Sequence, residues 1–285
     1  MLRPVCLGFL AAFWAVTVTA AGVTAPDASL IDDHWQRHDP RSDRTVDHGV
    51  WQGLLKRYIV ADEALSLNRF DYAAVTRDDK VALDTYLDRL QSVTVTRLSR
   101  AEQKAYWINL YNAFTVDIVL DRYPVDSIRD IGGGLFSRGP WSDDDFTVSV
   151  EGRALTLDDI EHGILRPLYR DPLIHYGVNC ASVGCPNLVR RAYTGATVDE
   201  MLARNARAFV NSPRGIQAVD GTGVTVSSIY VWFKADFGGT DAGVLRHVRR
   251  FADDARSRAL DGATRLRGHD YDWSLNDAQR PAVKE

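Results

Sequence analysis

The sequence has little of what marks several common protein classes. It holds only three cysteines and two methionines in 285 residues, and its net charge of −4 comes without any lysine- or arginine-rich block. The missing basic block argues against a nucleic-acid partner. The motifs G-x-S-x-G and H-E-x-x-H and the phosphate-binding glycine loop are also missing. This excludes the commonest serine-hydrolase, zinc-protease and P-loop patterns.

The N-terminal segment has the pattern of an export signal. Arg3 supplies the positive charge, Val5–Val18 is apolar, and small residues precede a cleavage point after Ala20 or Ala21. The apolar run is short for a membrane-spanning helix, and polar sequence follows it at once. We therefore expect a periplasmic or secreted protein with no stable membrane insertion after cleavage. An uncleaved anchor is the alternative.

The rest of the chain has the composition of a folded protein, with 45% hydrophobic and 25% charged residues, seven Trp and eleven Tyr. We divide it into a signal peptide (1–20), a polar flexible arm (21–46), a main domain (47–277) and a tail (278–285). The main domain is long enough to bury a large core.

The spacing of apolar residues predicts mostly helices, with a few short strands. Helices are expected over 47–60, 77–90, 99–120, 156–169, 197–211, 230–237 and 241–252. Strands are expected over 146–150, 153–155, 174–179, 215–219 and 223–226. The predicted fold class is α+β, a helix-rich single domain in which a buried central helix packs on a small, mainly antiparallel sheet.

The helix expected over 99–120 is apolar on two opposite faces, one of them carrying Trp107 and Tyr111 and the other Val116. Such a helix is buried between layers. Asn109 and Asn112 lie on the second face, where a buried amide needs hydrogen-bond partners. Either the two Asn tie loops to the helix, or one of them orients a catalytic group or donates to an anion.

The helix expected over 156–169 carries Glu161 on its inner face and His162 at the edge of that face. A buried carboxylate needs a partner. That partner is either an arginine or a histidine whose tautomer the carboxylate fixes. Because Glu161 and His162 are adjacent, we do not expect both to point at one place.

The stretch IHYGVNCASVGCPNL, residues 174–188, holds both cysteines that remain after signal cleavage, Cys180 and Cys185. An oxidising compartment favours a disulfide between them. Alternatively, Cys180 is a nucleophile at the end of a strand, with the backbone of 181–184 as an oxyanion cradle. A straight strand holds His175 about 16 Å from Cys180, so either the chain bends after Asn179 or His162 is the partner.

Several segments together resemble the domain-of-unknown-function family 547. They are AYWINLYNAFTVDIVLDRYP, SIRDIG, LTLDDIEHGILRPLYRDPLIHYGVNCASVGCPNL, AYTG, SSIYVWFKADFGG and YDWSLND, spread in order over about 99–277. The family's loop reads NCAS-x-SCP-x-L, and Gly184 stands at the serine position. The resemblance implies a domain found in exported bacterial proteins and some eukaryotic ones, without a settled activity. A distant fold-level analogy to papain-like or transglutaminase-like thiol enzymes warrants little about chemistry.

The favoured functional hypothesis is a thiol-dependent hydrolase or acyl/peptidyl transferase with no cofactor, acting on a peptide or small molecule. Cys180 would be the nucleophile and His175 or His162 the base, oriented by Glu161, Asn109, Asn112 or Asn179. The first alternative is a non-catalytic exported binding or scaffold protein in which a Cys180–Cys185 disulfide pins a loop. The second is a thiol redox or metal-handling accessory protein.

Overall fold

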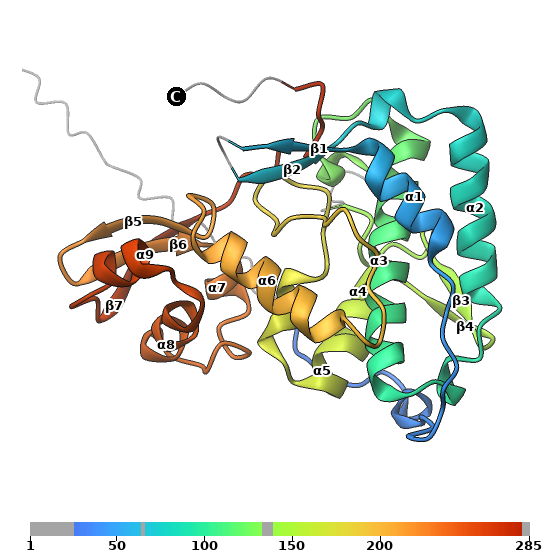
Figure 1. Cartoon of the computed structure of the whole chain (residues 1–285), viewed down its shortest axis with the longest axis horizontal. Helices are drawn as coiled ribbons and strands as arrows, with labels where there is room; N and C mark the ends of the chain where they lie inside the picture. Colours follow the sequence, from blue (N-terminus) through green and yellow to red (C-terminus); the bar gives the residue numbers. More distant parts are fainter. Residues whose placement is uncertain (1–25, 64–65, 133–138, 281–285) are drawn as a thin grey trace, which may run out of the picture.

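A helix of 23 residues, α3 (Arg100–Arg122), runs through the centre of the fold (Figure 1). Ser99 caps it by accepting the N–H of Glu102 at 3.3 Å. The helix ends shortly before Pro124, which has no N–H with which to continue it. Side chains on both faces of α3 are buried, which confirms the predicted central helix.

The structure is a computed structural model, and it describes residues 26–63, 66–132 and 139–280. Within these ranges the strands form two two-stranded sheets and one three-stranded sheet. All pairings between neighbouring named strands are antiparallel except that of β6 with β7. The α+β fold class predicted from the sequence is therefore confirmed.

Two helices and two hairpins pack around α3 in the first half of the fold. They are α1 (Gly49–Tyr58), α2 (Arg77–Gln91), the hairpin of β1 (Ile59–Asp62) and β2 (Leu67–Phe70), and the hairpin of β3 (Val148–Val150) and β4 (Arg153–Leu155). Trp51 of α1 and Tyr86 of α2 stack on each other in the core beside α3. Both helices and the second hairpin lie where the sequence predicts them, whereas the first hairpin was missed.

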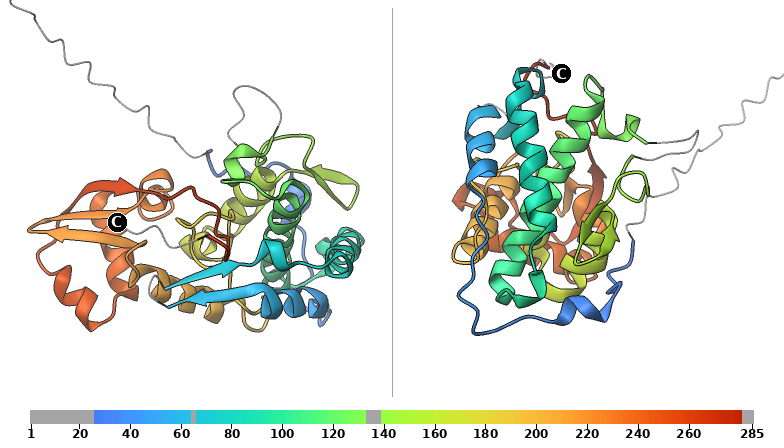
Figure 2. Two further views of the ribbon diagram at one scale, coloured as in Figure 1. Left: turned by 90° about the horizontal axis from the view of Figure 1, so that it is seen from above. Right: turned by 90° about the vertical axis from the view of Figure 1, so that its right-hand side faces the viewer.

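The C-terminal half builds a second hydrophobic core at the end of the molecule opposite α2 (Figure 2). Its elements are α6 (Val198–Val210), β5 (Ile216–Asp220), β6 (Gly223–Ser227), α7 (Ile229–Trp232), α8 (Asp241–Phe251), α9 (Asp254–Ala259) and β7 (Arg265–Asp270). The side chains of Tyr176, Tyr230 and His247 form hydrogen bonds of 2.8–3.0 Å inside this core. The β5–β6 hairpin was predicted, whereas α9 and β7 were not.

The helix predicted over 156–169 forms in three consecutive parts: α4 (Leu157–Ile160), a π-helical turn η5 (Glu161–Leu165) and α5 (Arg166–Tyr169). Thr156 opens it with a complete capping box, in which Asp159 returns the hydrogen bond. A π-turn inside a helix changes which side chains share a face, and such turns are frequent at functional sites.

The strand predicted over 174–179 is wrong, because this segment begins with a 3₁₀ helix, η6 (Pro172–Tyr176). Asp171 caps η6 by accepting the Leu173 N–H at 3.0 Å, and Pro172 occupies the first turn. Local capping therefore outweighs the apolar run that indicated a strand. The chain between His175 and Cys180 is not extended, so the separation expected for a straight strand does not apply.

The described part of the predicted flexible arm, residues 26–46, is packed against the domain. Trp35 is buried against Trp107, and the Ile31 N–H donates to the carbonyl of Gly163 in the π-turn at 3.1 Å. Single 3₁₀ turns complete the element list: η1 (Asp33–Gln36), η2 (Tyr72–Ala74), η3 (Val95–Arg97) and η4 (Ile128–Asp130). The arm is thus anchored over the element that carries Glu161 and His162.

The predicted signal peptide, residues 1–20, lies outside the described residues. Among the helices that the structure does describe, none combines the length and apolar character needed to cross a membrane.

Candidate functional site

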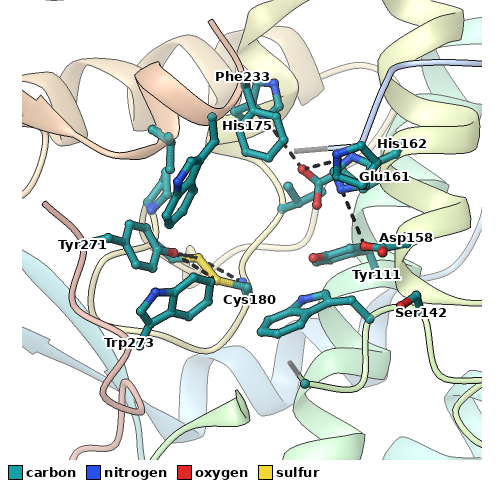
Figure 3. Close-up of a pocket in the computed structure, with 18 of the residues that line it drawn as sticks. Tyr111, Ser142, Asp158, Glu161, His162, His175, Cys180, Phe233, Tyr271 and Trp273 are labelled. Atoms are coloured by element: carbon teal, nitrogen blue, oxygen red, sulfur yellow. Dashed lines mark hydrogen bonds and ion pairs between the residues drawn. A yellow bond between two sulfur atoms is a disulfide. The ribbon is translucent and has the colours of Figure 1, made fainter. Parts of the chain in front are cut away.

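Side chains from both hydrophobic cores line a cavity of about 380 Å³. Its walls come from α3, the α4–η5 segment, η6, the loop of the two cysteines, α7 and the chain that follows β7. Figure 3 shows the cysteine and a group of aromatic rings on one side, with the carboxylates and imidazoles across the open space from them.

The aromatic wall is a continuous group of rings. Trp232 and Tyr271 lie 4.8 Å apart between ring centroids, Tyr271 and Trp273 lie 4.7 Å apart, and Trp273 meets Trp141 at 5.7 Å. These tilted and edge-on arrangements are favourable for aromatic pairs. The rings are only half-buried, so they offer apolar surface to whatever enters the cavity.

The opposite wall is built by the π-turn. Adjacent residues of an α-helix point about 100° apart, yet Glu161 and His162 both line the cavity. Asp158, four residues before His162, lines it too, with its Oδ1 3.5 Å from the Nε2 of His162. The π-turn thus gathers three ionisable side chains from one short segment, contrary to the expectation that Glu161 and His162 would point apart.

His175 of η6 lies beneath this wall and is held on both ring nitrogens. Its Nε2 is 2.7 Å from Oδ2 of Asp236, and its Nδ1 is 3.6 Å from Oε1 of Glu161. The ring stacks on Phe233 at 4.2 Å between centroids. The same Asp236 carboxylate accepts a 2.7 Å hydrogen bond from Nε of Arg166. Glu161, His175, Asp236 and Arg166 form one connected ionic network.

The environment moves the pKa values of these groups apart. Burial works against ionisation of Glu161, but His162 and His175 outweigh it and lower the Glu161 pKa to about 2. Burial, followed by the charge of Glu161, raises the pKa of Asp158 to about 7. Burial lowers the pKa of His162, whereas hydrogen bonds to Asp236 and Glu161 overcome burial and raise that of His175. Divergent pKa values in one cavity are typical of functional sites.

Cys180 and Cys185 are joined by a disulfide, with 6.4 Å between their Cα atoms. The sulfur of Cys180 lies 3.1 Å from both the Ser182 and the Tyr271 hydroxyl oxygens, and Tyr271 also donates to the Cys185 sulfur at 3.1 Å. Within the part of the chain that the structure describes, no histidine is hydrogen-bonded to Cys180. Both cysteines line the cavity; Cys180 is half-buried and Cys185 is 5% exposed.

The backbone of the cysteine loop is already occupied. The N–H groups of Ala181, Val183 and Gly184 donate to the side chain of Asn179 and the carbonyls of Ser274 and Asp272, respectively. These three amides therefore do not form the oxyanion cradle expected from the sequence. A Cβ at position 184 would lie 2.9 Å from ring atoms of Tyr271, so glycine here allows that ring to approach the disulfide.

The three candidate asparagines have structural hydrogen bonds. Asn109 donates to the carbonyl of Tyr193 at 2.8 Å and accepts its N–H at 3.1 Å. Asn112 donates to the Gly177 carbonyl and accepts the Asn179 N–H, both at 2.8 Å. Asn179 in turn donates to the carbonyl of Pro186 at 2.8 Å. The amides connect α3 to the loops beside the cavity, as the first of the two alternatives expected.

The structure brings Cys180, His175, Glu161 and His162 to the cavity, and adds residues that sequence reasoning missed. The missed cavity-lining or supporting residues are Tyr111, Trp141, Asp158, Arg166, Ser182, Trp232, Phe233, Asp236, Tyr271 and Trp273. Several lie in SSIYVWFKADFGG and YDWSLND, whose aromatic residues were the available signal. Among the described residues, no group of three His, Cys, Asp or Glu side chains could hold a metal ion.

Comparison with known proteins gives one match. The sequence model of a family described as "Protein of unknown function, DUF547" matches residues 95–210. No curated protein and no solved structure matches the chain. The matched range includes α3, the π-turn and the cysteine loop, but not Asp236 or the aromatic residues Trp232, Tyr271 and Trp273.

Proposed function

The family whose model matches residues 95–210 is described without an activity, so we propose a function from the cavity alone. The protein binds a small organic molecule, or a side chain of a peptide, in the cavity between the aromatic wall and the π-turn. We also propose that it is exported and that the Cys180–Cys185 disulfide pins the loop that closes one side of the cavity.

One observation carries this proposal: the Cys180 sulfur is bonded to Cys185 at the cavity wall. A sulfur in a disulfide is not a thiolate nucleophile, yet the cavity is complete with the disulfide in place. About 380 Å³ lined by aromatic rings and a few convergent polar groups matches the form of small-molecule sites. The disulfide also supports export, since such bonds persist in oxidising compartments.

Blocking the cavity tests this function. Ser142 is an exposed lining residue, so Ser142→Trp should fill the entrance without disturbing a core. Ser149→Trp, at an exposed position of β3 outside the lining, is the matched control. A panel of neutral, cationic and anionic organic compounds is titrated by calorimetry. We expect one-to-one binding by wild type and Ser149→Trp, and at least about a tenfold loss in Ser142→Trp.

If no compound binds wild type at a single site, or if Ser142→Trp binds as tightly as Ser149→Trp, the cavity is not a binding site.

A second candidate is the thiol-dependent hydrolase or transferase, which would operate on reduction of the disulfide. It is favoured by the position of the Cys180 sulfur, half-buried at the cavity wall with the hydroxyls of Ser182 and Tyr271 at 3.1 Å. These hydroxyls would stabilise a thiolate by hydrogen bonding. Both nitrogens of His175 face carboxylates, and those of His162 face Arg166 and Asp158, so one of the two imidazoles would have to exchange a partner to act as the base.

An electrophilic thiol probe tests this second candidate. Oxidised wild type should not react, and reduced wild type should react at Cys180 before the more buried Cys185. Cys185→Ala leaves the Cys180 thiol free without reductant, and Cys180→Ala is its matched control. If the protein is a thiol enzyme, Cys180 in Cys185→Ala should react with the probe near neutral pH at least about tenfold faster than a free peptide cysteine does. Labelling at the rate of the peptide cysteine would contradict the thiol-enzyme hypothesis.

A further inference from the structure

The charges and rings of the cavity indicate a ligand class, and this inference rests on the binding function proposed above. We infer that the cavity takes an organic cation, an alkylammonium group on a compact apolar body. The apolar body would lie against the aromatic wall, and the cation would lie between those rings and the Asp158 carboxylate.

Acidic and basic side chains meet around the π-turn. Three carboxylates, Asp158, Glu161 and Asp236, face two basic groups, Arg166 and His175, and contacts with Asp236 and Glu161 raise the pKa of His175 against burial. Asp236 contacts both basic groups, and Glu161 contacts His175. His162 stays neutral near pH 7 because burial lowers its pKa. One of the three carboxylates therefore forms no ion pair with either of these two groups.

That carboxylate is Asp158, whose side chain is 30% exposed and lines the cavity. Its nearest ion-pair partner in the described structure is His162, with Nε2 3.5 Å away; no lysine or arginine among the described residues forms a salt bridge with it. The raised pKa of Asp158, near 7, is the expected consequence of burial beside Glu161 without a cation. A bound cation would supply the missing charge.

The aromatic rings of the opposite wall provide a second attraction for a cation. Cations are attracted to the faces of aromatic rings within about 6 Å, and tryptophan is the strongest partner. Two rings of the cavity already carry such cations from the protein: Arg129 lies 5.1 Å from the Trp273 centroid and Arg166 lies 4.9 Å from that of Phe233. Trp141 and Trp232 also line the cavity, and no arginine or lysine lies over either ring in the described structure. They are available to a ligand.

The basic side chains near the cavity do not cancel its preference for a cationic ligand. Arg166 is held by Asp236 at 2.7 Å and by the Pro26 carbonyl at 2.6 Å. His175 is held by Asp236 and Glu161. Arg129, an exposed residue of η4, also lines the cavity, but its guanidinium lies over the Trp273 ring, and solvent and salt screen its charge. An anion in the cavity would instead meet the uncompensated Asp158.

Calorimetry with two aromatic probes of opposite charge tests the inference on the full oxidised chain. The probes are benzyltrimethylammonium, which keeps its charge at every pH, and phenylacetate. We expect one-to-one binding of the cation, with phenylacetate at least about tenfold weaker. Asp158→Asn should lower the affinity for the cation by about tenfold. Asp261→Asn, which removes an exposed charge outside the cavity lining, should leave that affinity unchanged.

Cation affinity should also rise between pH 6 and pH 8 in wild type as Asp158 ionises, and this rise should be lost in Asp158→Asn. Phenylacetate binding as tightly as the cation, an unaltered affinity in Asp158→Asn, or no binding of the cation would each overturn the inference. If neutral compounds bind wild type and fail with Ser142→Trp while the cation does not bind, the proposed binding function stands and only the charge preference falls.

Discussion

Glu161 is a carboxylate kept ionised inside the protein by its neighbours. It is 7% exposed, and its pKa falls to about 2 although burial opposes ionisation. An ionised group is tolerated in such a place only when it is paired and hydrogen-bonded. His175, in contact with its Oε1, and His162 beside it provide that environment, and the pKa of His175 is raised in return.

Glu161→Gln should therefore destabilise the fold in a pH-dependent way. A carboxyl with a native pKa near 2, against 4.5 in the unfolded chain, stabilises the native state by about 3 kcal/mol above pH 5. This contribution is lost as the pH falls from about 5 toward 2. Urea unfolding at pH 6.5 and at pH 3.5 measures it, and the gap between wild type and variant should narrow at the lower pH.

The control is Glu200→Gln, since Glu200 is exposed and pairs with Arg204 on the surface; its effect should stay within about 0.5 kcal/mol at both pH values. An equal loss of stability for Glu161→Gln at both pH values would show that its carboxylate charge is not what stabilises the fold. The loss of stability in the variant would then come from altered packing alone.

At the level of elements, long periodic helices were predictable and short elements were not. α2 and α3 carry apolar residues at helical spacing over several turns, and each begins at a residue whose side chain caps it, Thr76 and Ser99. β7 follows no clear alternation and is mostly exposed. Pairing with β6 orders this strand, and the local sequence does not predict that tertiary contact.

Two local sequence patterns indicate structures that do not form. The run from Ile174 to Asn179 has strand-like composition, but Asp171 and Pro172 start a 3₁₀ helix there. Residues 197–200, T-V-D-E, have the pattern of a capping box, but no box forms; the Thr197 hydroxyl contacts Thr194 and the sulfur of Met201 instead. In both places short-range hydrogen bonds decide between conformations that composition alone leaves nearly equal.

The site was predictable in part for the same reason. Cys180, His175, Glu161 and His162 were found because each is a chemically unusual residue in its local context. Asp236 and Tyr271 were missed because their roles exist only after the chain has folded: they come from 61 and 91 residues beyond His175 and Cys180. The π-turn was also not predicted from the sequence, although it contains both Glu161 and His162, which line the same cavity.

At the scale of the whole molecule, the cavity depends on both hydrophobic cores. Tyr111 and Val178 belong to the core around α3, whereas Ile229 belongs to the core of the C-terminal half, and all three line the cavity. The family match over 95–210 thus covers one wall and leaves out most of the aromatic wall. The matched segment is one part of a larger folding unit in this chain, not the whole unit.

A fragment containing only residues 95–210 should therefore fail to fold. It lacks α1 and α2, which cover α3, and the C-terminal elements that cover Tyr176 and Phe209. Exposing the buried faces of α3 and α6 costs about 25 cal/mol per Å² of apolar surface, against a net stability of only about 5–15 kcal/mol for an ordinary domain. Thermal unfolding followed by circular dichroism should give no cooperative transition, whereas residues 26–280 should give one. A sharp transition in the fragment would mean that the two halves fold independently, and the cavity would then be an interface between two domains.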